Sequence, residues 1–146
     1  MTNSISTETI AIIMQISFVV IIIVSFIVSV LFILSQQNLA NAIVEANNTP
    51  KIHNAWLWTQ LIPIWTYIAL LVTAIKLDEQ CKIYQNKYTK KLNFKARFVY
   101  WYIGLTILNL VPILNIVTII ASLVLFIVVW TNISKTTKEL SKIYIN

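Results

Sequence analysis

The chain has 146 residues, of which 58% are hydrophobic and 11% are charged, with a formal net charge of +6 and a mean hydropathy of +0.79. Soluble domains carry about 25% charged residues, so this composition excludes an ordinary water-soluble surface. The apolar runs are continuous rather than alternating, which argues against a β-barrel and predicts an all-α integral membrane protein. We expect one transmembrane domain over residues 1–146.

Residues 10–34 form the first predicted membrane-spanning helix, because 25 mostly apolar residues can cross a bilayer with some tilt. A cleaved signal peptide is the alternative, since Ala40-Asn41-Ala42 resembles a cleavage site. A signal peptide needs a basic start and a shorter apolar core, and residues 1–9 contain no Lys or Arg. We therefore favour a membrane helix.

A second predicted span covers 56–77, where Trp56 and Trp58 are typical of the aromatic belt at a membrane interface. Pro63 lies inside this span and is expected to kink it. The alternative is that Pro63 opens a helix after a short separate segment. Residues 36–55 form the polar interval between the first two spans.

Segment 77–96 is predicted to leave the membrane as a basic, amphipathic cytoplasmic hairpin. Residues 76–97 contain seven basic residues and two acidic ones. Helical spacing places one apolar stripe on this segment, formed by Leu77, Cys81, Tyr84, Tyr88 and Leu92. The basic cytoplasmic surface is predicted to consist of Lys82, Lys87, Lys90, Lys91, Lys95 and Arg97.

Residues 98–131 form a run of 34 residues without Asp, Glu, Lys, Arg or His. One straight helix of that length would measure about 51 Å, against about 30 Å for the hydrocarbon slab. The proline-bearing break around Pro112 therefore predicts two spans, 97–111 and 113–131, joined by a tight turn. A cytoplasmic tail, 132–146, follows them.

The distribution of basic residues predicts which side each loop faces. Ten of the eleven Lys and Arg residues lie in 76–97 or in 132–146, and basic loops stay cytoplasmic. Both clusters are cytoplasmic only if an even number of crossings separates them. The prediction is thus four transmembrane helices in two hairpins, with both termini cytoplasmic and 36–55 on the far side.

Two proline motifs, Gln60-Leu-Ile-Pro-Ile and Asn109-Leu-Val-Pro-Ile, match at an offset of 49 residues. They indicate either a duplication, with the hairpins as parallel repeats, or chance similarity in Ile- and Leu-rich sequence. A membrane helix with a proline beside an amide needs a neighbour for its freed backbone groups. The residues predicted to face the bundle interior are Gln60, Pro63, Asn109, Pro112 and Asn115.

Small residues four apart let membrane helices approach closely. Two such pairs are present, Ser25 with Ser29 and Thr118 with Ser122. They predict helix association, either between copies of the chain or within one chain.

No catalytic, metal-binding or cofactor-binding motif is found. His53 is the sole histidine and has no Cys, Asp or second His close by in sequence, and the single glycine excludes Gly-rich phosphate loops. We expect no enzyme and no cofactor. The leading hypothesis is a multi-pass accessory or scaffolding subunit of a bacterial cytoplasmic membrane.

Such a subunit would contact membrane lipid and would self-associate or dock a partner protein. The alternative is a small oligomeric pore or channel, lined by amide and hydroxyl side chains. A solute transporter is disfavoured because the spans carry no charge. Nucleic-acid binding by the basic segment is also disfavoured.

Overall fold

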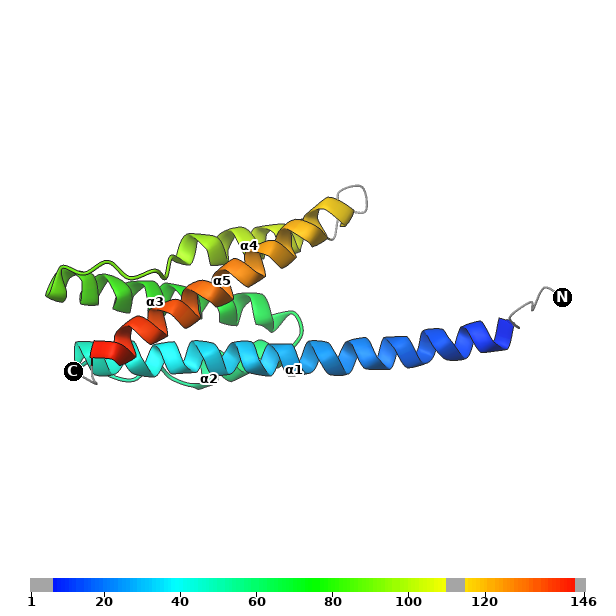
Figure 1. Cartoon of the computed structure of the whole chain (residues 1–146), viewed down its shortest axis with the longest axis horizontal. Helices are drawn as coiled ribbons and strands as arrows, with labels where there is room; N and C mark the ends of the chain where they lie inside the picture. The colour runs from blue at the N-terminus through cyan, green and yellow to red at the C-terminus, as the bar shows by residue number, and fades with distance from the viewer. Residues whose placement is uncertain (1–6, 110–114, 144–146) are drawn as a thin grey trace. The chain divides into compact units, whose positions relative to one another are not determined.

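The structure is a computed structural model that describes residues 7–109 and 115–143 (Figure 1). The prediction of an all-α protein is confirmed, because the described residues form helices and turns without a strand. The chain divides into two compact units, Met1–Phe32 and Ile33–Asn146. The elements are α1 (Thr7–Asn47), α2 (Ala55–Trp58), the 3-10 turn η1 (Thr59–Leu61), α3 (Trp65–Tyr88), α4 (Ala96–Leu108) and α5 (Asn115–Ile143).

Helix α1 contributes its first part to the first unit, and there its side chains are uncovered. Every side chain from residue 7 to residue 27 is exposed, on all faces of the helix. Most of them are Ile, Val, Phe or Met, and a helix that is apolar all round requires apolar surroundings. By length and composition, α1 and the stretch Ile116–Lys142 of α5 are able to cross a membrane.

The core of the second unit is formed by residues 33–47 of α1 together with α2, α3, α4 and α5. Its fully buried side chains are mainly aliphatic and include Ile33, Leu39, Ile43, Leu57, Leu77, Ile133 and Leu140. Helices α4 and α5 run in opposite directions side by side (Figure 1), with the rings of Tyr102 and Phe126 5.9 Å apart.

The region 56–77 was predicted as one kinked helix, but it is interrupted. A short separate segment, α2 with η1, precedes the helix α3, as in the alternative interpretation of Pro63. Ile62 is extended, as expected for a residue before proline. Ile64 then adopts φ 69° and ψ −50°, and the Trp65 N–H donates to the Pro63 carbonyl at 2.8 Å. This is the rare, strained form of the γ-turn. It reverses the chain, so that α3 begins only at Trp65.

Residues 36–49 lie beside the second half of α3. The Asn47 amide donates to the Gln80 carbonyl at 2.8 Å, and the Tyr88 hydroxyl donates to the Ala46 carbonyl at 3.1 Å. These contacts place residues 46–49 next to residues 80–88, so they do not support the prediction that 36–55 and 76–97 lie on opposite sides of a membrane. The distribution of basic residues could not reveal this arrangement, because the contacts are hydrogen bonds of uncharged amide and hydroxyl groups.

Helix α5 continues from the apolar stretch into the tail without a break. Ile133 and Leu140 are buried at 1% and 0% exposure, and their spacing of seven residues places them on one face of the helix, through which the tail packs. The Asn93 amide donates to the Glu139 carboxylate, which brings the tail next to the basic segment.

Candidate functional site

A buried amide pair joins α1 to the turn before α3. Gln36 Nε2 donates to Gln60 Oε1 at 3.0 Å, and Gln60 Nε2 donates back to Gln36 Oε1 at 3.1 Å. Gln60 Nε2 also lies 3.3 Å from Thr73 Oγ1. All three residues are buried, so each amide satisfies the other where water is excluded. Gln60 was expected in the interior; its partner Gln36 was not foreseen.

A second polar cluster lies nearer the charged end of the unit. Gln80 Oε1 accepts hydrogen bonds from Asn47 Nδ2 at 3.0 Å and from Thr49 Oγ1 at 2.7 Å. Asn47 is 6% exposed and follows two turns of buried aliphatic residues on α1. The cluster fixes the end of α1 against α3, and the left-handed Asn48 (φ 56°) then lets the chain leave the helix.

The remaining residues expected in the interior are placed differently. Pro63 is exposed, because the γ-turn after it projects the loop outward. Asn109 is half-buried, and its Nδ2 lies 3.5 Å from Ser122 Oγ on α5. Pro112 lies outside the described residues, as does the side chain of Asn115.

The two small-residue pairs have different surroundings. Thr118 and Ser122 are buried at 7% and 9% exposure, and Ser122 Oγ donates to the Ile119 carbonyl at 2.9 Å. This pair packs within one chain. Ser25 and Ser29 are exposed, with Ser29 Oγ bonded to the Ser25 carbonyl at 2.8 Å.

The apolar stripe of the basic segment is covered by the chain itself. Leu77, Cys81, Tyr84 and Leu92 are 5% exposed or less. Tyr88 is 48% exposed, but its hydroxyl is bound to α1. The stripe is therefore core and offers no free docking surface.

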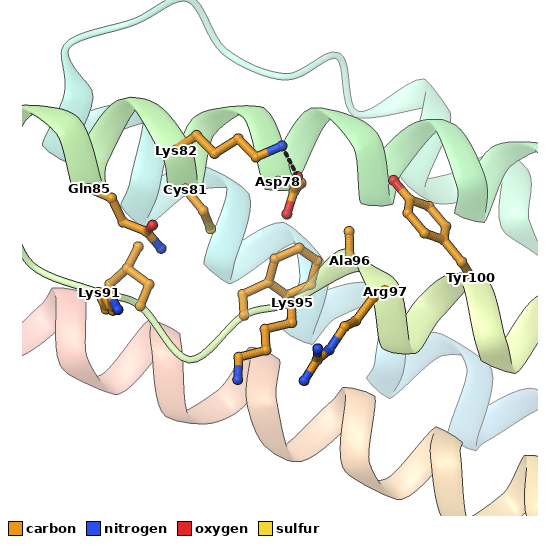
Figure 2. A pocket seen from close by; sticks show the side chains of 11 residues that line it. Asp78, Cys81, Lys82, Gln85, Lys91, Lys95, Ala96, Arg97 and Tyr100 are labelled. Atoms are coloured by element: carbon orange, nitrogen blue, oxygen red, sulfur yellow. Dashed lines mark ion pairs between the residues drawn. The ribbon is translucent and has the colours of Figure 1, made fainter.

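A basic cavity of about 400 Å³ opens between α3 and the segment that leads into α4 (Figure 2). Side chains alternate along this extended segment. Leu92, Phe94 and Ala96 are buried, whereas Lys91, Asn93, Lys95 and Arg97 are exposed. Period-two alternation directs the exposed set to the side opposite the buried set. Three cations of the exposed set, Lys91, Lys95 and Arg97, line the cavity at its edge.

The α3 wall of the cavity carries Asp78, Cys81 and Lys82. Lys82 Nζ pairs with Asp78 Oδ2 at 2.7 Å, and this bond raises the pKa of the Lys82 ammonium. Burial, with a smaller contribution from Asp78, raises the pKa of the Cys81 thiol to about 12. The thiol is therefore protonated at neutral pH and is not a nucleophile.

The basic residues of this surface were predicted from the sequence, but the cavity that four of them line was not. Lys82, Lys91, Lys95 and Arg97 line it, whereas Lys87 and Lys90 are exposed and do not. The alternation in Lys-Leu-Asn-Phe-Lys-Ala-Arg (91–97) was the available signal, because it indicates an extended segment with one buried side.

Within residues 7–109 and 115–143, no group of three or more His, Cys, Asp or Glu side chains could hold a metal ion. Comparison of the chain with protein-family models, with curated proteins and with solved structures found no match.

Proposed function

We propose that this chain is a non-enzymatic accessory subunit of a bacterial cytoplasmic membrane and that it self-associates through α1. The observation that supports this proposal is the uncovered apolar helix over residues 7–27. Its side chains need lipid or another helix around them, because the chain leaves them exposed.

The polar residues of this helix favour a second copy as one neighbour. Gln15, Ser25 and Ser29 are all exposed, and at about 100° per residue they fall within an arc of about 80° on one side of the helix. An amide exposed to hydrocarbon lacks a hydrogen-bond partner, which costs several kcal/mol. The same side of a second α1 supplies an amide for Gln15 and small residues for close approach.

The pore alternative is less well supported by the positions of the polar side chains. Gln60, Thr73, Thr118 and Ser122 are buried inside a single chain. Gln60 and Thr73 are bonded to each other. A pore needs such groups turned toward a shared aqueous channel, so an accessory role fits the burial better.

The membrane layout that we propose differs from four spans. Residues 36–49 contact α3 at 80–88, so we place both on the cytoplasmic side after a single crossing by α1. The N-terminus then lies outside. All eleven Lys and Arg residues follow residue 50, so this layout puts every one of them on the cytoplasmic side, in accord with the positive-inside rule.

In this layout α4 and α5 form a hairpin that enters the membrane from the cytoplasmic side and returns to it. Helix α4 has 13 residues, which corresponds to about 20 Å. Helix α4 is therefore shorter than the hydrocarbon slab of about 30 Å. Its entry and return keep the tail next to the basic segment, as the contact of Asn93 with Glu139 requires.

Self-association is tested by energy transfer between donor- and acceptor-labelled copies of the full chain in liposomes. Gln15→Leu should weaken association about 5- to 30-fold, because interhelical bonds in membranes contribute about 1–2 kcal/mol. Ser17→Leu is the matched control, since Ser17 lies about 200° around the helix from Gln15. A wild-type chain that stays monomeric at high protein-to-lipid ratio, or equal effects of the two variants, would refute the proposal.

A further inference from the structure

We propose that the basic cavity between α3 and α4 binds the phosphate headgroup of an anionic membrane lipid. The cavity of about 400 Å³ is lined by four cationic side chains and one acidic one. This site is separate from the self-association face on α1, whereas the choice of a membrane lipid as ligand rests on the proposed membrane layout.

The charges at the cavity are not balanced. Asp78 is the sole acidic residue of the lining, and it is bound to Lys82 at 2.7 Å. Lys91, Lys95 and Arg97 have no acidic partner among the described residues. An anion is the ligand that three unbalanced cations attract, and phosphate oxygens suit both the ammonium groups and the planar guanidinium fork.

The geometry brings two of these cations together. Lys95 and Arg97 extend in the same direction on either side of Ala96, where α4 begins (Figure 2). The first turn of α4 has no side-chain cap at Lys95. A phosphate held between Lys95 and Arg97 would therefore also face the positive end of the α4 dipole.

The surroundings of the cavity favour a lipid over free phosphate. Both walls continue into exposed apolar surface, with Leu71 and Ile75 on α3 and Tyr100 and Trp101 on α4. Acyl chains can lie along this surface while the headgroup occupies the cavity. Aromatic residues such as Tyr100 and Trp101 are typical of the membrane–water interface, where lipid phosphates are found.

A second cavity of comparable size lacks this charge pattern. It measures about 480 Å³ and is lined by Glu45 and Lys51, whose charges balance, and by neutral residues. Charge imbalance next to apolar surface therefore distinguishes the cavity between α3 and α4 from this second cavity.

Native mass spectrometry of the full chain in detergent, titrated with phosphatidylglycerol or phosphatidylcholine, tests the proposal. The wild-type chain should retain phosphatidylglycerol preferentially. Lys95→Gln with Arg97→Gln should weaken this retention about 30-fold, because each cation near a lipid surface strengthens anion binding about fivefold. Lys135→Gln with Lys138→Gln removes the same charge from the tail and should change retention less than threefold.

A second variant separates charge from folding. Lys95→Arg with Arg97→Lys keeps both charges and should retain the lipid, and the elution volume of each variant reports on its fold. Equal losses in the cavity and tail variants would overturn the site in favour of a general charge effect. Displacement of phosphatidylglycerol by millimolar inorganic phosphate would overturn the lipid assignment, since the site would then recognise the free ion.

Discussion

Gln36 and Gln60 face each other inside the second unit and exchange two amide hydrogen bonds, of 3.0 and 3.1 Å. The exposure of the two residues is 1% and 7%. Two residues 24 positions apart thus form a closed polar pair in an apolar core. This pair ties the helix that enters the unit to the turn that precedes α3.

Removal of one amide from this pair should destabilise the protein more than removal of both. Gln36→Leu leaves the buried Gln60 amide without its main partner, which costs about 1–3 kcal/mol. Gln36→Leu with Gln60→Leu should cost less than Gln36→Leu alone, as measured by SDS-induced unfolding. Asn41→Leu, at an exposed position of α1, is the control; additive losses would contradict the pairing.

Ile64→Gly should stabilise the chain. Ile64 has φ 69° and its side chain is 85% exposed, so glycine relieves backbone strain of about 1–3 kcal/mol with little loss of packing. Glycine loses more conformational entropy on folding than isoleucine does, and this loss offsets about 0.5–1 kcal/mol of the gain. Ile62→Gly, at a position with φ −82°, should instead lower the melting temperature, and a decrease for both variants would refute the strain.

Cys81 should resist alkylation in the folded chain. Burial raises the pKa of its thiol from 9.0 to about 12, so the reactive thiolate is scarce at pH 8. N-ethylmaleimide should label the chain only after denaturation in SDS. The free energy of unfolding should decrease from pH 9 upward, because the unfolded state then releases the proton that the folded state retains. Cys81→Ala should remove this part of the pH dependence.

Ser122→Leu should destabilise the α4–α5 hairpin by about 1–3 kcal/mol, because the side chain is 9% exposed and a larger group overpacks the contact with α4. Thermal unfolding followed by circular dichroism measures the loss. Val124→Leu, at an exposed position, should have little effect. A change in oligomeric state with unchanged unfolding would instead place Ser122 at an interface between chains.

Membrane sidedness follows from single cysteines in a Cys81→Ala background. Glu8→Cys should react with an impermeant maleimide on intact cells, whereas Asn41→Cys and Lys138→Cys should react only after permeabilisation. A four-span layout predicts the reverse for Glu8 and Asn41. Labelling of Asn41→Cys from outside would therefore refute the single crossing by α1.

Composition and periodicity were sufficient to predict that the protein is helical and that it contains helices able to cross a membrane, of which the structure shows two among the described residues. They were also sufficient for the apolar spacing of the basic segment, because burial of Leu77, Cys81 and Tyr84 follows the 3.6-residue period. Periodicity identifies which side of a helix is buried. It does not identify what covers that side.

The partners of polar groups were the part that the sequence did not reveal. Nothing in the local pattern pairs Gln36 with Gln60 or Asn47 with Gln80, since the residues of each pair are 24 and 33 positions apart. These long-range bonds decide that residues 36–49 lie beside α3. Positive charges constrain only the loops that contain them, and between residues 36 and 50 there are none.

The unbroken length of α5 has a mechanical consequence. No turn separates its apolar stretch from its charged end, so its 29 residues form one continuous helix of about 44 Å. In the proposed membrane layout, a tilt of the apolar half of α5 by about 10° in a thinner bilayer would move the end of the tail by about 3 Å, for the 12 residues beyond Thr131. Bilayer thickness would thereby be transmitted as a displacement at the cytoplasmic surface.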